Sequence, residues 1–483
     1  MGTAERRYEL LKILCRRRYE TLQNLASVFG VSTRTIQRDI EVLSSTEPIY
    51  TQCGRYGGGV YVVEGYSVDR VYMTDSELHV LKKLYESANR SICALTNEET
   101  DLLRAGSRNT PNRNQNNERI FAMNEKEKQL FKALCRFRDP ISDTALTEFA
   151  TPAVLGHLFF NRMSGIAYGT LRCNGLLGKV NREFRSSLSA AWEQNVQKNE
   201  SFRKCVAFLS GLLASSDCKV AMLKGALLCA RYPDGYRTSN DVDLLVSPSD
   251  VTKIGHLLSS AGFRQGNVRN GAFIPATREQ VIESRMMRGE TVPYVLEVNL
   301  PFMKFLEVDV NFSLDYKNGS ETALTKMLSA ACRKDENGIS VPTLDDKDFF
   351  LHLCAHLYKE ATTLPWIEMH RDMTLYKYCD LYLLLSEMTD PQLRQIFERA
   401  GELGMEKVCA YAILETMGLF DMDHPFARHI AGVALGDDPD FCRKVVSPKD
   451  KKLLMYRTAD VTERFFLEAR EKDLAEVSGN EST

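Results

Sequence analysis

The stretch LKGALLCARYPDGYRTSNDVDLLV, residues 223–246, ends in a short apolar strand that opens with two aspartates. Because alternate side chains of a strand share a face, Asp241 and Asp243 are expected on the same side. Two carboxylates at such a short distance repel each other. Without a counter-charge, one of them would take up a proton or turn away. Many such pairs are only solvated strand ends, so a strand end and a metal site are both open interpretations.

A third carboxylate is available further along the chain. The run FLEVDVNFS, residues 305–313, predicts a strand on which Glu307 and Asp309 share one face. Asp309 is the better candidate, because Val308 and Val310 pack on the other side. A divalent cation would remove the repulsion, and Mg²⁺ prefers oxygen ligands and commonly bridges one or two carboxylates to substrate phosphates. An aspartate here could also accept the proton of an attacking hydroxyl or complete a two-metal site.

The segments around these acids predict a small α/β unit with a mixed sheet. Residues 219–232 predict a short strand, a turn at Lys224–Gly225 and a helix, and residues 294–300 form a further β-rich run. Helical spacing dominates residues 125–215. His352 and His356 are four residues apart on a predicted helix, a spacing that can chelate a metal, but packing is the favoured interpretation because no third ligand is evident.

The first 65 residues show three helical patterns followed by a β-hairpin. The apolar stripes are Leu10, Leu11 and Leu14, then Leu22, Leu25 and Val28, then Ile36, Ile40 and Leu43. The second helix closes at Gly30, and Ser32 can cap the third. Residues 48–66 predict two strands joined by a turn at Gly57–Gly59. This is the layout of a winged helix-turn-helix.

The start of the third helix carries side chains of the types that reach base edges and phosphates in the major groove of DNA. The candidate DNA contacts are Thr33, Arg34, Thr35, Gln37 and Arg38, with Arg16–Arg18, Arg55 and Tyr56 as further contacts to the DNA backbone. A small helical packing unit and a winged helix that docks on a protein are the alternatives.

The N-terminal pattern is similar to a known group of proteins. LQNLASVFGVSTRTIQRDIEVL, residues 22–43, followed by a glycine-rich hairpin, resembles the DNA-binding domain of DeoR-type and WYL-type bacterial regulators. The resemblance covers residues 5–65 and implies a recognition helix over residues 32–45. A bracing helix follows in MTDSELHVLKKLYESAN, but no WYL-type ligand domain comes after it.

The second half resembles putative nucleotidyltransferases of the DNA polymerase β-like superfamily. The resemblance rests on L-K-G, a helix, Tyr-Pro and R-x-x-x-D-x-D, and it extends through residues 306–312, 344–360 and 370–385. It implies Mg²⁺ (or Mn²⁺) bound by Asp241 and Asp243, with Asp309 completing the triad.

The resemblance has one departure that concerns the phosphates. In the wider superfamily a Gly-Ser turn holds the nucleotide phosphates, and here Lys224–Gly225 stands in its place. Phosphate binding would then use the Gly225 backbone and the Lys224 ammonium. Arg237 and Ser239 are expected to be phosphate-binding or scaffold groups. Lys377 is a further candidate for the triphosphate, although a solvated lysine is an equal alternative.

The bulk composition narrows the class of protein. A formal net charge of −2 excludes a chain that is basic throughout, so nucleic-acid binding must use a local patch. The thirteen cysteines are odd in number and include no C-x-x-C pair, which fits reduced thiols in a cytosol. No run approaches the roughly 18 apolar residues of a membrane span. The predicted location is cytoplasmic, with no membrane partner.

The composition also predicts the domain boundaries. RAGSRNTPNRNQNNER, residues 104–119, is nearly free of apolar residues and is expected to be an exposed linker. The predicted parts are 1–66 (winged helix-turn-helix), 67–103 (bracing helices), 104–121 (linker), 122–215 (helical segment), 216–320 (nucleotidyltransferase α/β core), 321–440 (its C-terminal helical part) and 441–483 (charged helix and tail).

We therefore expect an α+β multidomain chain, in which a winged helix-turn-helix precedes a mixed-sheet, polymerase β-like nucleotidyltransferase core flanked by helical segments. The predicted enzyme transfers a nucleoside monophosphate from an NTP to an acceptor, which is a small molecule, a tRNA or a protein. The expected partners are DNA, the NTP and that acceptor, and a homodimer is left open. Two alternatives remain: a transcription regulator whose nucleotidyltransferase-like domain only senses a nucleotide, and a toxin-like enzyme acting on tRNA or protein.

Overall fold

The computed structural model describes two compact units. It describes residues 6–7, 9–11, 13–14, 19–44, 49–52, 59–62, 123–141, 150–269, 272–287, 289–314, 321–336, 338–448, 452–467 and 469–477. The first unit comprises Met1–Leu78 with Arg269–Ala272, and the second comprises the rest of the chain. The predicted bracing helices (67–103) and linker (104–121) lie outside the described residues.

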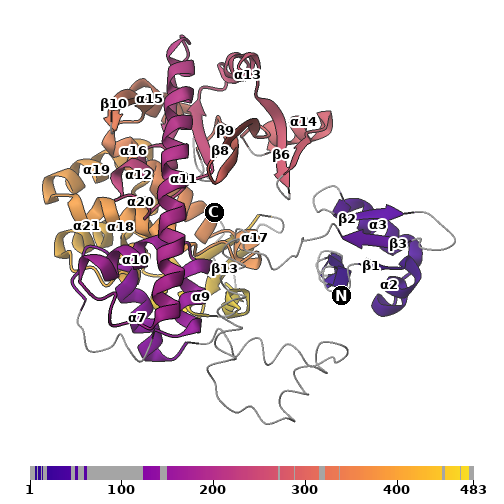
Figure 1. Cartoon of the computed structure of the whole chain (residues 1–483), viewed down its shortest axis with the longest axis horizontal. Helices are drawn as coiled ribbons and strands as arrows, with labels where there is room; N and C mark the ends of the chain where they lie inside the picture. Colours follow the sequence, from indigo (N-terminus) through magenta and orange to yellow (C-terminus); the bar gives the residue numbers. More distant parts are fainter. Residues whose placement is uncertain are drawn as a thin grey trace. The chain divides into compact units, whose positions relative to one another are not determined.

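The first unit contains the predicted helices and hairpin (Figure 1). Helical residues among 6–14 are followed by β1 (Tyr19–Glu20), α2 (Leu22–Phe29), α3 (Thr33–Ser44), β2 (Ile49–Gln52) and β3 (Gly59–Val62). The three strands form an antiparallel sheet in the order β1-β3-β2. The winged helix-turn-helix layout is therefore confirmed for these residues.

The apolar stripes of the first unit meet in one core, as the helical spacing predicted. Its buried members are Leu10, Leu11, Leu14, Leu25, Ala26, Ile36, Ile40, Leu43 and Val60. Val28, expected on the same side as Leu25, is instead 52% exposed. Ser32 caps α3 by accepting a hydrogen bond from the Thr35 backbone N–H at 3.2 Å, as predicted.

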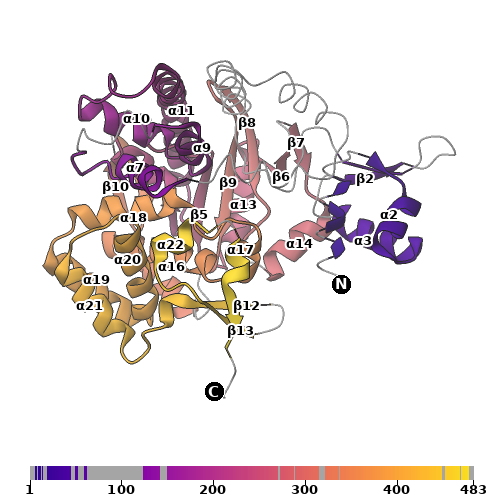
Figure 2. The same cartoon turned by 90° about the horizontal axis from the view of Figure 1, so that it is seen from below.

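The described part of the second unit opens with four helices. These are α7 (Glu125–Cys135), α9 (Pro152–Phe160), α10 (Ser164–Cys173) and α11 (Arg182–Ala214), so the expected helical segment over 122–215 is confirmed where it is described. The 33-residue α11 contacts α10, α12 and the sheet strand β9 (Figures 1 and 2). It therefore connects the helical segment to the elements that carry the candidate site.

A six-stranded mixed sheet forms the centre of the second unit. Its strands are β4 (Val220–Leu223), β5 (Asp241–Val246), β6 (Arg264–Arg269), β7 (Ala272–Pro275), β8 (Tyr294–Leu300) and β9 (Met303–Asn311), in the order β4-β5-β9-β8-β6-β7. β5 and β9 are parallel, whereas β4 with β5 and β8 with β9 are antiparallel. Three helices belong to this region: α12 (Gly225–Arg231), α13 (Val251–Ser260) and α14 (Arg278–Met287).

A hairpin covers the outer edge of β4. β10 (Cys332–Glu336) pairs with β11 (Ile339–Thr343), and α15 (Glu321–Ser329) precedes them. The Thr343 hydroxyl on β11 donates a buried hydrogen bond of 2.9 Å to the Met222 carbonyl on β4. Edge strands present unpaired backbone groups, and this contact satisfies one of them.

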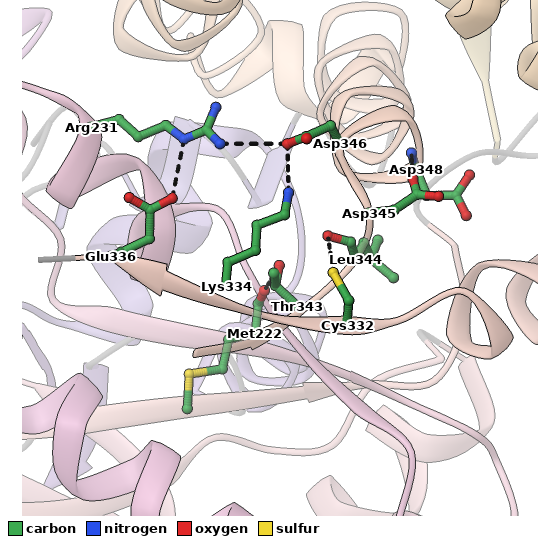
Figure 3. Close-up of polar contacts among 10 residues, drawn as sticks. All are labelled: Met222, Arg231, Cys332, Lys334, Glu336, Thr343, Leu344, Asp345, Asp346 and Asp348. Carbon is green, nitrogen blue, oxygen red and sulfur yellow. Dashed lines mark hydrogen bonds and ion pairs between the residues drawn. The ribbon is translucent and has the colours of Figure 1, made fainter. Parts of the chain in front are cut away.

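Ion pairs link this hairpin to α12 and to the following helix, α16 (Asp346–Ala361). Arg231 at the end of α12 lies 3.4 Å from Glu336 and 3.5 Å from Asp346, and Lys334 lies 2.5 Å from Asp346 (Figure 3). Asp345 caps α16 by accepting a hydrogen bond from the Asp348 backbone N–H. These contacts hold the end of α12 that lies away from the Lys224–Gly225 turn.

Helices make up most of the C-terminal part. α16 is followed by α17 (Leu364–Glu368), α18 (Leu375–Glu387), α19 (Asp390–Leu403), α20 (Glu406–Leu419) and α21 (Pro425–Leu435). This agrees with the helical part expected over 321–440, apart from the β10–β11 hairpin at its start.

The prediction of a charged helix and tail over 441–483 is wrong for the described residues. They form a three-stranded antiparallel sheet of β12 (Lys444–Ser447), β13 (Lys452–Tyr456) and β14 (Leu474–Glu476), with the short α22 (Val461–Phe465) between β13 and β14. The sheet contacts α17 (Figure 2). The charges misled the prediction because two arginines, Arg464 and Arg470, are buried in ion pairs instead of facing water.

Arg464 shows this burial most clearly. It is 1% exposed, and its Nη2 donates hydrogen bonds of 2.7 and 2.6 Å to the two carboxylate oxygens of Glu415 on α20. A second buried pair joins Arg470 to Asp372 at 2.8 Å. The first pair fixes the C-terminal segment to α20, and the second fixes it to the turn between α17 and α18.

Replacing Arg464 with methionine should lower the free energy of unfolding by about 3–5 kcal/mol, because Glu415 would be left buried without its partner. Adding Glu415→Gln should recover part of the loss. Urea unfolding followed by the fluorescence of Trp192 and Trp366 measures the effect, since both tryptophans lie in the second unit.

Arg428→Met is the matched control, because Arg428 is exposed on α21. Equal losses for Arg464→Met and Arg428→Met would contradict the assignment of stability to the buried pair.

Candidate functional site

The acids of β5 and β9 lie on one face of the central sheet. The parallel register pairs Asp241 with Glu307 and Asp243 with Asp309. Paired residues of neighbouring strands point to the same side, as do alternate residues along a strand. Val308, between the two acids of β9, is fully buried on the other side. The expected sharing of a face is therefore confirmed, and four carboxylates come together.

A lysine contacts this carboxylate cluster, by which we mean Asp241, Asp243, Glu307 and Asp309. Lys224 Nζ lies 2.9 Å from Asp243 Oδ1, and the two side chains are 17% and 11% exposed. Lys224 stands between β4 and α12 with φ 49° and ψ −116°. This left-handed region is rarely occupied by residues other than glycine. Local backbone strain therefore accompanies the placement of this ammonium group against Asp243.

Gly225 allows a close approach to the loop before β5. A Cβ atom added to Gly225 would stand 2.6 Å from Ser239 Oγ and 2.7 Å from Ser239 Cβ, which is closer than real Cβ contacts allow. The Ser239 hydroxyl in turn donates a hydrogen bond of 2.8 Å to Asp241 Oδ1. The absence of a side chain at Gly225 thus permits the contact that orients Asp241.

The surroundings of Asp241 favour its ionised form. Burial acts to raise its pKa, but the hydrogen bond from Ser239 and the charges of Lys224 and Arg237 outweigh burial, and the pKa of Asp241 lies below its usual value. Asp241 therefore stays ionised.

The acids on β9 behave in the opposite way. Burial, followed by the charges of Asp243 and Asp241, raises the pKa of Asp309 well above its ordinary range, although Lys224 partly offsets this. Burial and the charge of Asp241 raise the pKa of Glu307 to about 7. The cluster thus holds more negative charge than its cationic surroundings balance.

Arg237 has the contacts of a scaffold residue, one of the two roles expected for it. Its Nε and Nη2 donate hydrogen bonds of 3.1 and 3.2 Å to the carboxylate of Asp380 on α18, and the side chain is buried. The Tyr232 hydroxyl donates to the same carboxylate at 3.0 Å. Burial acts to lower the pKa of Arg237, but Asp380 raises it well above the ordinary value, so the guanidinium stays charged.

Lys377 is paired with a carboxylate. Its ammonium group forms an ion pair with Glu360 on α16, and His356 Nε2 lies 3.5 Å from the same carboxylate. This pairing does not agree with the alternative of a solvated lysine, and a contact with the triphosphate stays a prediction. His352, on the same helix, is buried, in agreement with the packing interpretation.

Sequence reasoning missed the aromatic side chain of Tyr376, which forms cation–π contacts with three basic residues near Arg237 and Asp380. The ring centroid of Tyr376 lies 4.5 Å from the Arg237 guanidinium, 5.4 Å from that of Arg162 and 5.8 Å from Lys377 Nζ. Arg162 is exposed, with φ 58°, in the turn between α9 and α10. In the sequence, the one signal for Arg162 was its place at the break between two helical patterns.

The first unit presents a separate candidate interface on α3. Thr33, Arg34, Gln37 and Arg38 are exposed, Thr35 is partly exposed, and Ile36 and Ile40 are buried. The neighbouring Asp39 is buried and accepts hydrogen bonds from Arg6 Nε at 2.7 Å and Arg7 Nε at 2.8 Å. Arg55, Tyr56 and Arg16–Arg18, which were predicted to add DNA contacts, lie outside the described residues.

Comparison with protein families decides the class of the second unit. The model of a family described as "Uncharacterised nucleotidyltransferase" matches residues 148–421. The chain belongs to this nucleotidyltransferase family. A solved structure of an antigenic nucleotidyltransferase-like protein from Paracoccidioides brasiliensis covers 41% of this chain and 92% of its own, with 18% identity and a TM-score of 0.23.

The N-terminal unit is an HTH domain. The model of an HTH domain matches residues 6–60. The chain is also 33% identical over 86 residues to YobV of Bacillus subtilis (strain 168), described as an uncharacterized HTH-type transcriptional regulator. That alignment covers 18% of this chain and 27% of YobV, so it concerns only a small part of each protein. An HTH domain is thus fused to a nucleotidyltransferase domain in one chain.

The chemistry of the carboxylate cluster fits the cation that a nucleotidyltransferase implies. Its acids offer oxygen ligands, which Mg²⁺ and Mn²⁺ prefer. Burial and the charges of Asp243 and Asp241 raise the pKa of Asp309, and a bound cation would offset both effects. As the side chains stand, no three His, Cys, Asp or Glu residues of the described ranges form a group that could hold a metal ion. No helix in the described part of this nucleotidyltransferase is long and apolar enough to cross a membrane.

Gly225→Ala should lower the free energy of unfolding of the nucleotidyltransferase by about 1–3 kcal/mol, because the new methyl group would displace Ser239. Urea unfolding measures the loss. Gly211→Ala on α11 is the control, because a Cβ atom there meets nothing within 4 Å. Alanine is also the better helix former by about 1 kcal/mol, so this control should be neutral or stabilising. Equal losses in the two variants would contradict the close-approach argument.

Proposed function

We propose that the chain is a metal-dependent nucleotidyltransferase that transfers a nucleoside monophosphate from an NTP to an acceptor group. The observation that carries the proposal is the parallel register of β5 and β9, which gathers Asp241, Asp243 and Asp309 on one face beside Lys224. The family match supports the reaction class. The acceptor is a hydroxyl, amine or phosphate of a small molecule, a tRNA or a protein.

The bonds exchanged in this reaction are defined by its class. The acceptor oxygen or nitrogen attacks the α-phosphorus, a new bond to phosphorus forms, the bond to the β-phosphate oxygen breaks, and pyrophosphate leaves. The proton of an acceptor hydroxyl would pass to Asp309, which neighbours Asp243 on the face that carries the cluster. Lys224 and the backbone of Gly225 would bind the phosphates.

Asp241 and Asp243 would hold Mg²⁺ or Mn²⁺, with Asp309 as a further ligand in a two-metal site. When bound, the metal would neutralise the charge that develops on the phosphate oxygens. Ser239 would keep Asp241 in position, and Arg237 would support the loop between α12 and β5 through Asp380. Lys377 is proposed to reach the triphosphate only after its ion pair with Glu360 opens.

We also propose that the HTH domain binds DNA through the exposed face of α3. The support is the exposure of Arg34 and Arg38 on a helix whose other side is buried, together with the family match. In this arrangement the HTH domain would hold the enzyme on DNA or control the gene of the protein itself.

The partial match to a transcriptional regulator supports a regulatory role for the chain. A second function is then that the nucleotidyltransferase domain only senses a nucleotide. Both functions predict nucleotide binding. They differ in the fate of the nucleotide, because a sensor releases it unchanged whereas the enzyme transfers part of it to an acceptor.

Transfer of label from an NTP separates the two functions. The protein is incubated with each α-labelled NTP, Mg²⁺ and cell extract, and we expect the wild type to label an acceptor. Asp241→Asn/Asp243→Asn should abolish labelling, because the replacement amides lack the charge needed to bind the metal.

Asp423→Asn/Asp437→Asn is the matched control, since both aspartates are exposed away from the cluster. No labelling by the wild type with any NTP would overturn the enzyme in favour of the sensor. Unchanged labelling by Asp241→Asn/Asp243→Asn would overturn the assignment of the site.

Arg34→Ala/Arg38→Ala should abolish binding to the promoter region of the gene for this protein, because both base and phosphate contacts would be lost. Electrophoretic mobility shift at several salt concentrations measures the affinity. Arg394→Ala/Arg428→Ala removes two exposed arginines from the second unit and should leave DNA binding unchanged. The recognition-helix assignment fails if the α3 variant binds like this control.

A further inference from the structure

We infer that Lys224 is a built-in counter-ion of the carboxylate cluster that competes with the metal for Asp243, so that metal binding and phosphate binding each promote the other. The inference rests on the proposed function, because it assumes that the cluster binds a metal and that Lys224 binds phosphate. It adds a rule for the order of events: the ammonium group leaves Asp243 when a phosphate arrives, and the metal then gains access to that carboxylate.

The contact geometry gives Lys224 this position. Its Nζ lies 2.9 Å from Asp243 Oδ1, and Asp243 is the direct neighbour of Asp309 in the parallel register. Arg237, the other cation whose charge acts on Asp241, already donates two hydrogen bonds to Asp380. The ammonium of Lys224 is therefore a positive charge in direct contact with the cluster.

The backbone at Lys224 is fixed while the side chain can exchange partners. The Lys224 carbonyl accepts hydrogen bonds from the N–H groups of Leu227 and Leu228 at the start of α12. Gly225 lies so close to Ser239 that no side chain would fit between them. A lysine side chain carries its compact charge on a flexible stem of four carbons. Its ammonium group can therefore turn from Asp243 to a nearby phosphate without movement of the main chain.

This exchange couples the two ligands by electrostatics. Without phosphate, a divalent cation must displace the ammonium group from Asp243 or bind beside it, and two neighbouring cations repel each other. With phosphate present, the ammonium group has an anionic partner and Asp243 is released. By thermodynamic linkage, the factor by which phosphate improves metal binding equals the factor by which metal improves phosphate binding.

A purely structural role for Lys224 makes a different prediction. If the ion pair with Asp243 only stabilises the fold, removing the ammonium group should lower stability and leave the affinity for a metal ion unchanged or weakened. Under the counter-ion hypothesis, the same change should tighten the binding of a metal ion on its own.

Mn²⁺ alone is the probe that separates these roles, because it requires neither nucleotide nor acceptor. Binding of Mn²⁺ to the full chain is measured by the loss of the electron paramagnetic resonance signal of free Mn²⁺. We expect Lys224→Met to bind Mn²⁺ at least about fivefold more tightly than the wild type, the lower end of typical coupling between ligands.

Lys219→Met is the matched control, since Lys219 is exposed just before the other end of β4. It removes the same charge at a distance from the cluster and should leave the affinity for Mn²⁺ close to that of the wild type. Equal affinities for the wild type and Lys224→Met, or weaker binding by Lys224→Met, would overturn the inference. Equal tightening by both variants would do the same, because it would reflect net charge alone.

Further variants keep failure of this inference distinct from failure of the proposed function. Asp241→Asn/Asp243→Asn, alone and combined with Lys224→Met, should remove the Mn²⁺ site. If these variants bind Mn²⁺ as the wild type does, the metal is not at the cluster, and both the proposed site and the inference fall. If they lose Mn²⁺ while Lys224→Met shows no tightening, only the inference falls. Should Lys224→Met not fold, Lys224→Gln provides the same comparison with a polar side chain of similar length.

Discussion

The parallel pairing of β5 with β9 is the constraint on which the candidate site depends. It brings together acids that are more than sixty positions apart in the chain, Asp241 with Glu307 and Asp243 with Asp309. Such crowding of carboxylates is unfavourable unless cations offset it. Much of the surrounding arrangement can be understood as the supply and placement of that positive charge.

The immediate supports of the cluster come from three different parts of the chain. Lys224 follows the edge strand β4, Ser239 lies in the loop before β5, and Asp380, which holds Arg237, belongs to α18. Each support is buried or nearly so, and each is hydrogen-bonded or ion-paired. The site is therefore specified by long-range packing of the second unit as well as by the short motif that contains the two aspartates.

Local patterns were sufficient to predict the elements that carry the acids. Alternation predicted that Asp241 and Asp243 share a face, and helical spacing predicted the helix-turn-helix and the segment up to α11. Such patterns could not predict which residues pair over long distances in the chain. Nothing in the sequence around Arg464 indicates that it is buried against Glu415. The C-terminal sheet was therefore mistaken for a charged helix and tail. Tyr376 and Arg162 were missed for the same reason, since they meet only through tertiary packing.

The hydrogen bond from Thr343 to the Met222 carbonyl also bears on where the nucleotidyltransferase domain ends. Met222 is on β4, two residues before Lys224, and its carbonyl is satisfied by a hairpin more than a hundred residues later in the chain. A fragment cut at residue 320 would keep all four acids of the cluster but would expose the outer edge of β4 to solvent and to other strands. The packing that supports the acidic motif thus extends beyond the stretch that contains it, to the β10–β11 hairpin and to Asp380 on α18.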